Sequence, residues 1–328
     1  LGTDILRLWC GNKNSQDYSP EEKADLFEEC RRAAKIAEQF DATLCMECHN
    51  NTYTNTDFVS GPTQGRLAEW DGETWTILET CQFNEVTGRT SIGDAILATG
   101  ADNASAILKV FTDGRWSSYR LPKATHTQDH SWTTEWPRIR EVESERWLMN
   151  CSGMFYELPA MQYAGKVWGV RPVSTHLRII GDFCSWLGML VLAGDQTTPI
   201  MDANPFVGQP QANLWFGKTD DLWRFGKPQG WGGPWRDTPI KPGKPSDPFL
   251  MTGFEHKCLH LAHDAAEPVT FTIEVDFLGN GSWRACEELR VNGGRGYRAH
   301  VFPIGFSAHW VRLTADRACT ATAQFVYT

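Results

Sequence analysis

The sequence predicts a mainly β protein: a β-propeller of four-stranded blades, complete or short of blades, with a short N-terminal β-α-β segment. Three observations lead to this prediction. Helical periodicity is confined to residues 1–56. Beyond them, short apolar or alternating runs are separated by polar turns, which is the pattern of antiparallel strands. Several of these turns also recur at about the length of one propeller blade.

The composition fits a folded chain that can bury a sizeable core. Of the 328 residues, 41% are hydrophobic and 22% are charged. The net charge of −9 argues against nucleic acid as a partner, because phosphate binding needs a basic surface. No apolar run reaches membrane-spanning length, so no membrane partner is expected. The ten scattered cysteines are expected to be mainly free thiols, and the fifteen tryptophans favour either β-rich packing or sugar stacking.

Residues 1–56 have the pattern of one β-α-β unit. The short apolar run Ile5–Trp9 predicts the first strand. Ser19 and Glu22 have the spacing of a capping box, and the helix is expected to continue to about Phe40. Thr43–Glu47 then predicts a buried strand, which gives the order strand, helix, strand.

This segment resembles part of a xylose-isomerase-like TIM barrel, of the sugar-phosphate isomerase and epimerase group. The resemblance rests on Arg7–Trp9, the helix, and Cys48–Thr52 directly after Glu47. It implies that Glu47 is a metal ligand, with His49 beside it, and hence a divalent metal and sugar isomerisation as one alternative function. A complete barrel needs roughly 250 residues, so residues 1–56 would form a fragment: a structural relic, an appended subdomain, or one part of a join of two unrelated segments.

Residues 57–328 are expected to form the propeller. Four segments share a polar turn that is followed within a few residues by Trp: 65–78, 107–116, 214–223 and 275–283. Asp71 and Asp113 begin two such turns about 42 residues apart, which matches a four-stranded blade. Turn-like positions at 152–153 and 194–195 continue this spacing. The alternative is an irregular β-sandwich with aromatic hairpins.

The last part of the chain begins with a segment rich in Gly and Pro. Residues 226–248 predict a long loop, which in a compact domain is typically functional or a linker. After it, residues 269–277 alternate with the period of a strand. We expect 249–328 to form the last blade or a small β-sandwich cap.

The strongest candidate site is the stretch 126–141, which is unusually rich in charged and aromatic residues. If the chain is extended after Pro137, Arg138 and Arg140 lie on one face of a strand. As the inner strand of a blade, it would present both side chains to the channel, where a guanidinium pair could bind a carboxylate bidentately. The alternative is that the two arginines pair internally with Asp129, Glu135 or Glu141.

Polar residues before this strand supply candidates for chemistry. His130 is the preferred general acid or base, because its pKa lies near neutrality, and Asp129 could orient it. His176 is expected to begin the next inner strand and to face the same channel. Trp132 and Trp136 are candidates for stacking on a sugar ring. The predicted catalytic set is His126, Asp129, His130, Glu135 and His176, and no cofactor is required.

Residues 57–328 also resemble a family of bacterial β-propeller proteins of polysaccharide-degrading systems, related in architecture to rhamnosidase and lyase propellers. The resemblance rests on segments 129–141, 154–159, 306–312 and 320–324. It implies an oligosaccharide or polysaccharide partner, and a glycoside hydrolase or polysaccharide lyase acting on an acidic or rhamnose-containing glycan. A non-catalytic glycan-binding or scaffold protein is the alternative. The family is often secreted or periplasmic, although no signal peptide opens this sequence.

Overall fold

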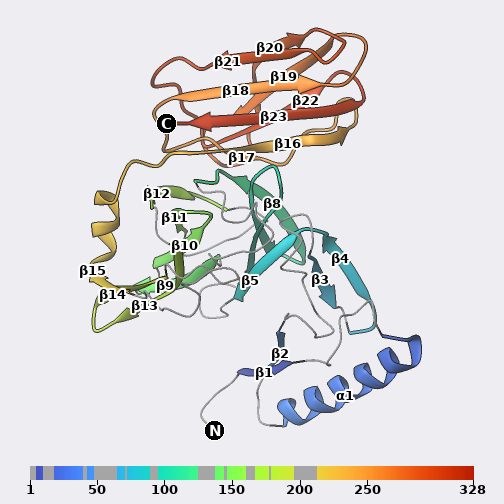
Figure 1. Ribbon diagram of the computed structural model, residues 1–328, viewed down its shortest axis with the longest axis vertical. Helices are drawn as coiled ribbons and strands as arrows, with labels where there is room; N and C mark the ends of the chain where they lie inside the picture. Colours follow the sequence, from blue (N-terminus) through green and yellow to red (C-terminus); the bar gives the residue numbers. More distant parts are fainter. Residues whose placement is uncertain are drawn as a thin grey trace, which may run out of the picture. The chain divides into compact units, whose positions relative to one another are not determined.

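The computed structural model is mainly β, as the sequence predicts, and separates into two compact units, Leu1–Gln82 and Phe83–Thr328 (Figure 1). The first unit therefore extends past residue 56, where the sequence placed the boundary. No helix in the part of the chain that the structure describes is long and apolar enough to cross a membrane. The structure describes residues 5–9, 18–39, 43–47, 65–70, 72–88, 95–124, 137–143, 146–159, 167–176, 179–195 and 213–328.

The first unit contains the predicted β-α-β unit. Its elements are β1 (Ile5–Trp9), α1 (Pro20–Glu38), β2 (Thr43–Glu47), β3 (Leu67–Trp70) and β4 (Trp75–Glu79). Strands β1 and β2 pair in parallel, and Ser19 and Glu22 form the predicted capping box. Strands β3 and β4 form the antiparallel hairpin predicted around residue 72. Within the described residues of this unit, β1 and β2 are the parallel pair, so these residues supply one β-α-β unit and not a barrel.

The second unit begins with three meanders, in which consecutive strands are hydrogen-bonded neighbours. Meander A consists of β5 (Gln82–Gly88), β6 (Ile96–Ala101), β7 (Ala106–Thr112) and β8 (Arg115–Leu121). Meander B consists of β9 (Arg138–Glu143), β10 (Arg146–Cys151), β11 (Met154–Leu158) and β12 (Arg171–Thr175). Meander C consists of β13 (Ile179–Trp186), β14 (Met189–Asp195) and β15 (Asn213–Gly217).

The turns within the meanders lie partly where the sequence placed them. Asp113 and Gly114 join β7 to β8, and both have positive φ, as do the two residues at 152–153 that join β10 to β11. The prediction at 194–195 was wrong, because these residues end β14. The turn lies instead at Leu187 and Gly188, with φ of 50° and 77°, and Leu at positive φ is too uncommon for the sequence to signal it. The hairpin predicted at 214–223 was also wrong, since β15 is followed by a 3₁₀ helix, η3 (Thr219–Arg224).

Meander B is buried on both faces. Alternate residues of β10 belong to two different apolar clusters. Met149 and Cys151 share the first cluster with side chains of β6, β7 and β8 in meander A. Leu148 shares the second cluster with Phe183 and Leu192 of meander C. The three meanders therefore stack in the order A, B, C, with one apolar layer on each side of B.

The rest of the second unit is a β-sandwich of two four-stranded arrays. One array has the order β16 (Gly230–Ile240), β23 (Cys319–Tyr327), β18 (Lys257–His263) and β21 (Tyr297–Val301). The other has the order β17 (Phe249–Leu250), β22 (Trp310–Ala315), β19 (Val269–Asp276) and β20 (Arg284–Val291). This order is that of a jelly roll. The jelly roll begins within the segment for which the sequence predicted a loop and includes all of 249–328.

The prediction of a long loop over 226–248 was wrong because β16 occupies its centre. As the outermost strand of its array, β16 tolerates proline, which cannot donate to a central ladder. Its register against β23 shifts on either side of Trp235. Gly233 allows close approach, since a Cβ there would lie 1.9 Å from the carbonyl oxygen of Ala323. Gly233 is therefore explained by the close approach of β16 to β23, and it does not indicate a loop.

Meander A and the jelly roll share one sheet and one core. Strand β8 pairs in parallel with β17 through Arg120 and Phe249, so an eight-stranded sheet runs from β20 to β5. The backbones of Lys123 and Trp231 also exchange two hydrogen bonds of 2.8 Å. The described strands form open sheets, and no closed barrel or closed propeller is found among them.

Candidate functional site

The first strands of the three meanders bring four charged side chains together. Arg138 and Arg140 lie two residues apart on β9, and both reach the same two carboxylates. Nη1 of Arg140 lies 2.6 Å from Oε1 of Glu85 on β5, and its Nη2 lies 3.0 Å from Oδ2 of Asp182 on β13. Nη1 of Arg138 lies 3.3 Å from Oε2 of Glu85. We call Glu85, Arg138, Arg140 and Asp182 the inner-strand cluster.

The inner-strand cluster balances two positive charges against two carboxyl groups, but the carboxyl groups differ in exposure. The side chain of Glu85 is 13% exposed, whereas that of Asp182 is 51% exposed. Burial raises the pKa of Glu85 above its ordinary value, although Arg140 and Arg138 act in the opposite direction. Burial acts to lower the pKa of Arg140, but Glu85 and Asp182 together raise it. The cluster thus has a buried end at Glu85 and a solvent-facing end at Asp182.

The sequence predicted the shared face of the two arginines but not their partners. Arg138 and Arg140 pair with Glu85 and Asp182, which were not among the expected partners. Glu141, which was among the expected partners, lies on β9 itself and is the cross-strand partner of Trp147 on β10. The repeat of meanders could have indicated the two missed residues, Glu85 and Asp182. Each lies in the first strand of its meander, as Arg138 and Arg140 do. Aligning the meanders by their first strands would have placed both carboxylates beside the arginine pair.

His176 directly follows β12 and is buried against meander B. Its Nε2 lies 2.7 Å from Oδ1 of Asn150, and its ring lies 4.8 Å from that of Phe155. Asn150 is the cross-strand partner of Arg138, so it connects the histidine with the arginine strand. The structure therefore places His176 and Arg138 on either side of Asn150, although His176 follows the last strand of meander B rather than beginning a strand of meander C.

The other predicted site residues lie outside the described residues. The segment 125–136 is one such part, and it precedes β9 directly in the sequence. The residues concerned are His126, Asp129, His130, Trp132, Glu135 and Trp136. Of the predicted metal ligands, Glu47 ends β2 with its side chain not described, and His49 is outside the described residues. Among the side chains that are described, no group of three His, Cys, Asp or Glu could hold a metal ion.

The exposed end of the inner-strand cluster is the part that an anion from solution could reach. Asp182 is half exposed and binds the guanidinium groups of both arginines. A carboxylate from solution could replace it on Arg140 with little desolvation, because Arg140 is itself 32% exposed. Glu85 would remain as the buried partner of both arginines. The planar guanidinium fork favours such planar anions.

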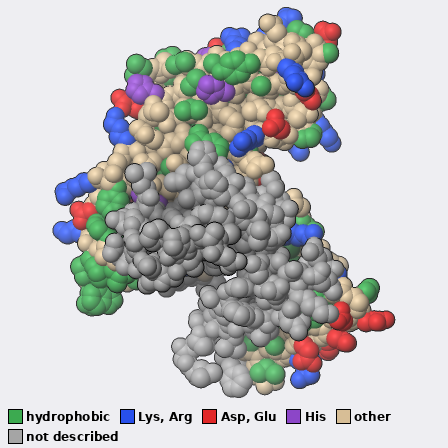
Figure 2. All heavy atoms as spheres, in the orientation of Figure 1, with side chains coloured by type: hydrophobic (Ala, Val, Ile, Leu, Met, Phe, Trp, Pro, Cys, Tyr) green, Lys and Arg blue, Asp and Glu red, His purple; other side chains and the backbone are tan. Residues whose placement is uncertain are grey.

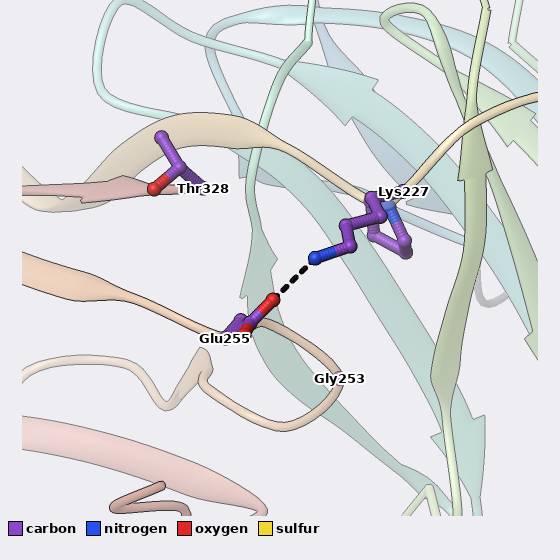
Figure 3. A pocket seen from close by; sticks show the side chains of 5 residues that line it. Lys227, Gly253, Glu255 and Thr328 are labelled. Atoms are coloured by element: carbon purple, nitrogen blue, oxygen red, sulfur yellow. Dashed lines mark hydrogen bonds and ion pairs between the residues drawn. The ribbon is translucent and has the colours of Figure 1, made fainter. Parts of the chain in front are cut away.

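A second polar feature is a small hollow near the C-terminus, lined by Lys227, Pro228, Gly253, Glu255 and Thr328. Lys227 and Glu255 form an ion pair across it, as Figure 3 shows, and this hydrogen bond lowers the pKa of Glu255. The volume is about 220 Å³, which is below the roughly 300 Å³ at which ligand pockets usually begin. The hollow is therefore smaller than a typical ligand pocket.

The comparisons with known proteins do not assign a family. No protein-family model matches the sequence, and no curated protein matches it. A solved structure described as the crystal structure of PirA is similar over 30% of this chain and 84% of its own, with 9% sequence identity and a TM-score of 0.18. A TM-score this low supports no conclusion about fold or function.

Proposed function

We propose that the chain is a carbohydrate-active protein that binds an acidic glycan at the inner-strand cluster. In this proposal, meanders A, B and C are consecutive blades of a propeller-like fold, and their first strands surround the ligand. The observation that carries the proposal is the arginine pair on β9, in which Arg140 is partly exposed and shares a half-exposed carboxylate that a ligand could replace. The family resemblance of residues 57–328 supports carbohydrate as the ligand class.

A uronic acid fits this site better than a neutral sugar. Its carboxylate could take the place of Asp182 on Arg140 and keep the charge balance of the cluster. A neutral hydroxyl in that place would leave one guanidinium charge without its counter-charge, which is costly at a partly buried site. The expected ligand is therefore a uronate-containing oligosaccharide.

A stronger version of the proposal is that the chain also cleaves the glycan that it binds. Residues 125–136 are separated from Arg138 by Pro137 alone, so His130 is the proposed general acid or base, with Asp129 to orient it and Glu135 and His126 as further candidates. A glycan bound through a uronate would be a substrate for a hydrolase or a lyase. Without turnover, the same site would make the chain a glycan-binding module.

Calorimetric titration with oligogalacturonate tests the binding. We expect Arg140→Met to weaken binding by about tenfold or more, which corresponds to about 1.4 kcal/mol. Arg146→Met is the matched control, because Arg146 is likewise a partly exposed arginine, 26% exposed, that pairs with carboxylates, here three, but lies outside the inner-strand cluster. The control is expected to bind as the unchanged protein does.

The same titration with a neutral oligosaccharide of equal length completes the test. Equal affinity for the acidic and neutral oligosaccharides would refute the role of the arginine pair, as would unchanged binding by Arg140→Met. Incubation with the acidic oligosaccharide then separates an enzyme from a module. Loss of turnover in His130→Ala with binding retained would support catalysis, whereas binding without turnover in the unchanged protein would leave a binding module.

A further inference from the structure

Glu85 is the largely buried counter-charge of both arginines in the inner-strand cluster. Its Oε1 accepts a hydrogen bond from Arg140, and its Oε2 accepts one from Arg138. The charged groups that face Glu85 are these two arginines on β9 and the carboxylate of Asp182 on β13. With both carboxyl groups ionised, the four charges sum to zero, so the cluster has no surplus positive charge for a further anion.

The carboxylate of Asp182 is held beside the cluster by a bond of its own. Its Oδ1 accepts a hydrogen bond of 2.8 Å from the backbone N–H of Phe183, while its Oδ2 contacts both arginines. Phe183 is in turn buried in the apolar layer between meanders B and C. A ligand carboxylate could displace Oδ2 of Asp182 from Arg140, but the negative charge of Asp182 would remain close to the site.

An acidic ligand would therefore bring a third carboxylate to two guanidinium groups. A negative charge nearby disfavours the ionised form of a carboxyl group, and burial does so as well. Burial already raises the pKa of Glu85, and the charge of Asp182 acts in the same direction. The ligand would add to this effect. Glu85 responds more strongly than Asp182 because its side chain is 13% exposed, whereas that of Asp182 is 51% exposed and meets water.

We propose that an acidic glycan binds to the inner-strand cluster together with a proton from solution, which the carboxylate of Glu85 takes up. This inference rests on the proposed function, because it concerns the same site and the same ligand class. The proton restores the charge balance, since the two guanidinium groups then face the ligand carboxylate and Asp182. A neutral Glu85 keeps its carbonyl oxygen as an acceptor for Arg140.

Coupling of the ligand to a proton makes the affinity depend on pH. If the ligand favours protonated Glu85, then protonated Glu85 favours the ligand to the same extent. The affinity should fall as pH rises through the range in which Glu85 is ionised in the free protein and protonated in the complex. The fall is at most about tenfold for each pH unit, because one proton is involved. The range begins above pH 4.5, since the pKa of Glu85 in the free protein is raised from that value.

Calorimetric titration with oligogalacturonate in buffers of different ionisation enthalpy measures the proton uptake directly. At about pH 6 the free uronates are ionised, because ordinary carboxyl groups titrate near pH 4. The unchanged protein is expected to take up a measurable fraction of a proton and to bind more weakly at about pH 7 than at about pH 5. Glu85→Gln cannot titrate at this position, so its uptake should be smaller and its affinity at about pH 7 higher. The difference in uptake isolates Glu85, because the histidines are common to both proteins.

Glu274→Gln is the matched control for the loss of a carboxylate that pairs with an arginine. Glu274 is 21% exposed and pairs with Arg312 in the jelly roll, outside the inner-strand cluster. Figure 2 shows Lys and Arg side chains interspersed with Asp and Glu side chains over the visible face of the jelly roll. This face therefore concentrates no positive charge for an acidic ligand, and the control is expected to keep the proton uptake of the unchanged protein.

The outcomes separate this inference from the proposed function. Binding with equal proton uptake in the unchanged protein and in Glu85→Gln would overturn the inference and leave the proposed function standing. Absence of binding by the unchanged protein at every pH would overturn both. If Glu85→Gln does not fold, the unchanged protein still decides, because binding without proton uptake, or an affinity that does not fall as pH rises, would overturn the inference by itself.

Discussion

Meander B and the jelly roll are both built from antiparallel strands, but they differ in how many faces are buried. In β18 of the jelly roll, buried and partly exposed residues alternate over all seven positions. In β10 of meander B, five successive residues are buried. The difference arises because each array of the jelly roll has a solvent face, whereas meander B lies between two other sheets. Polar residues on β10 must therefore find partners inside the protein, while those on β18 can meet water.

The largest effects on the free energy of unfolding are expected from substitutions in the apolar cores of the jelly roll and of meander B. These substitutions also test whether the two regions unfold together. Phe325 of the jelly roll and Phe155 of meander B are fully buried. Replacing either with Ala is expected to lower the free energy of unfolding by about 3–5 kcal/mol. Because one apolar cluster spans meanders A and B and the jelly roll, we expect a single transition in urea, with coincident circular dichroism and fluorescence.

The neighbouring change Val326→Ala is the control, since this residue is 42% exposed. It is expected to alter the free energy of unfolding by less than about 0.5 kcal/mol. If Phe325→Ala produced two separate transitions, the jelly roll would unfold independently and the shared core would not couple the regions.

An intermediate effect is expected for the buried polar contact of meander B. Asn150→Leu keeps the approximate size of the side chain but removes the acceptor for Nε2 of His176. An unsatisfied buried polar group costs about 1–3 kcal/mol, and urea unfolding should show this loss. Thr272→Val on the jelly roll is the control, because Thr272 lies on a solvent face of β19. If Asn150→Leu and Thr272→Val lowered the free energy of unfolding equally, polar residues of meander B would depend no more on internal partners than those of the jelly roll.

The smallest effect concerns pH and the inner-strand cluster. The pKa of Glu85 is raised in the folded protein, so the folded state binds its proton more tightly than the unfolded state does. The free energy of unfolding should therefore fall as pH rises from the ordinary value of 4.5 through the raised value. Glu85→Gln lacks this titration. The stability of the unchanged protein minus that of Glu85→Gln is expected to decrease as the pH rises above 4.5.

Urea unfolding at several pH values measures this difference. Glu274→Gln is the control for loss of an ion pair, because Glu274 pairs with Arg312 in the jelly roll. A difference that rises with pH for Glu85→Gln would mean that the arginines, and not burial, dominate the pKa of Glu85.

Local sequence patterns were sufficient to predict an element when the element depends only on residues close together in the sequence. Ser19 and Glu22 predict the helix start because a capping box involves residues three positions apart. Residues 269–277 predict β19 because a strand with one solvent face alternates. The same rule failed for β16, where Gly and Pro indicated a loop. Only the position of β16 at the edge of a sheet, against β23, explains why these residues form a strand.

The sequence by itself determined that Arg138 and Arg140 share one face, because the pleat of a strand alternates its side chains. Only the tertiary structure decided what they meet. Glu85 lies 53 residues before Arg138, and Asp182 lies 42 residues after Arg140. No local period connects such positions, since their contact depends on how three sheets stack. The tertiary structure likewise decided that Trp186, Leu214 and Phe216 of meander C are exposed to solvent although their side chains are apolar.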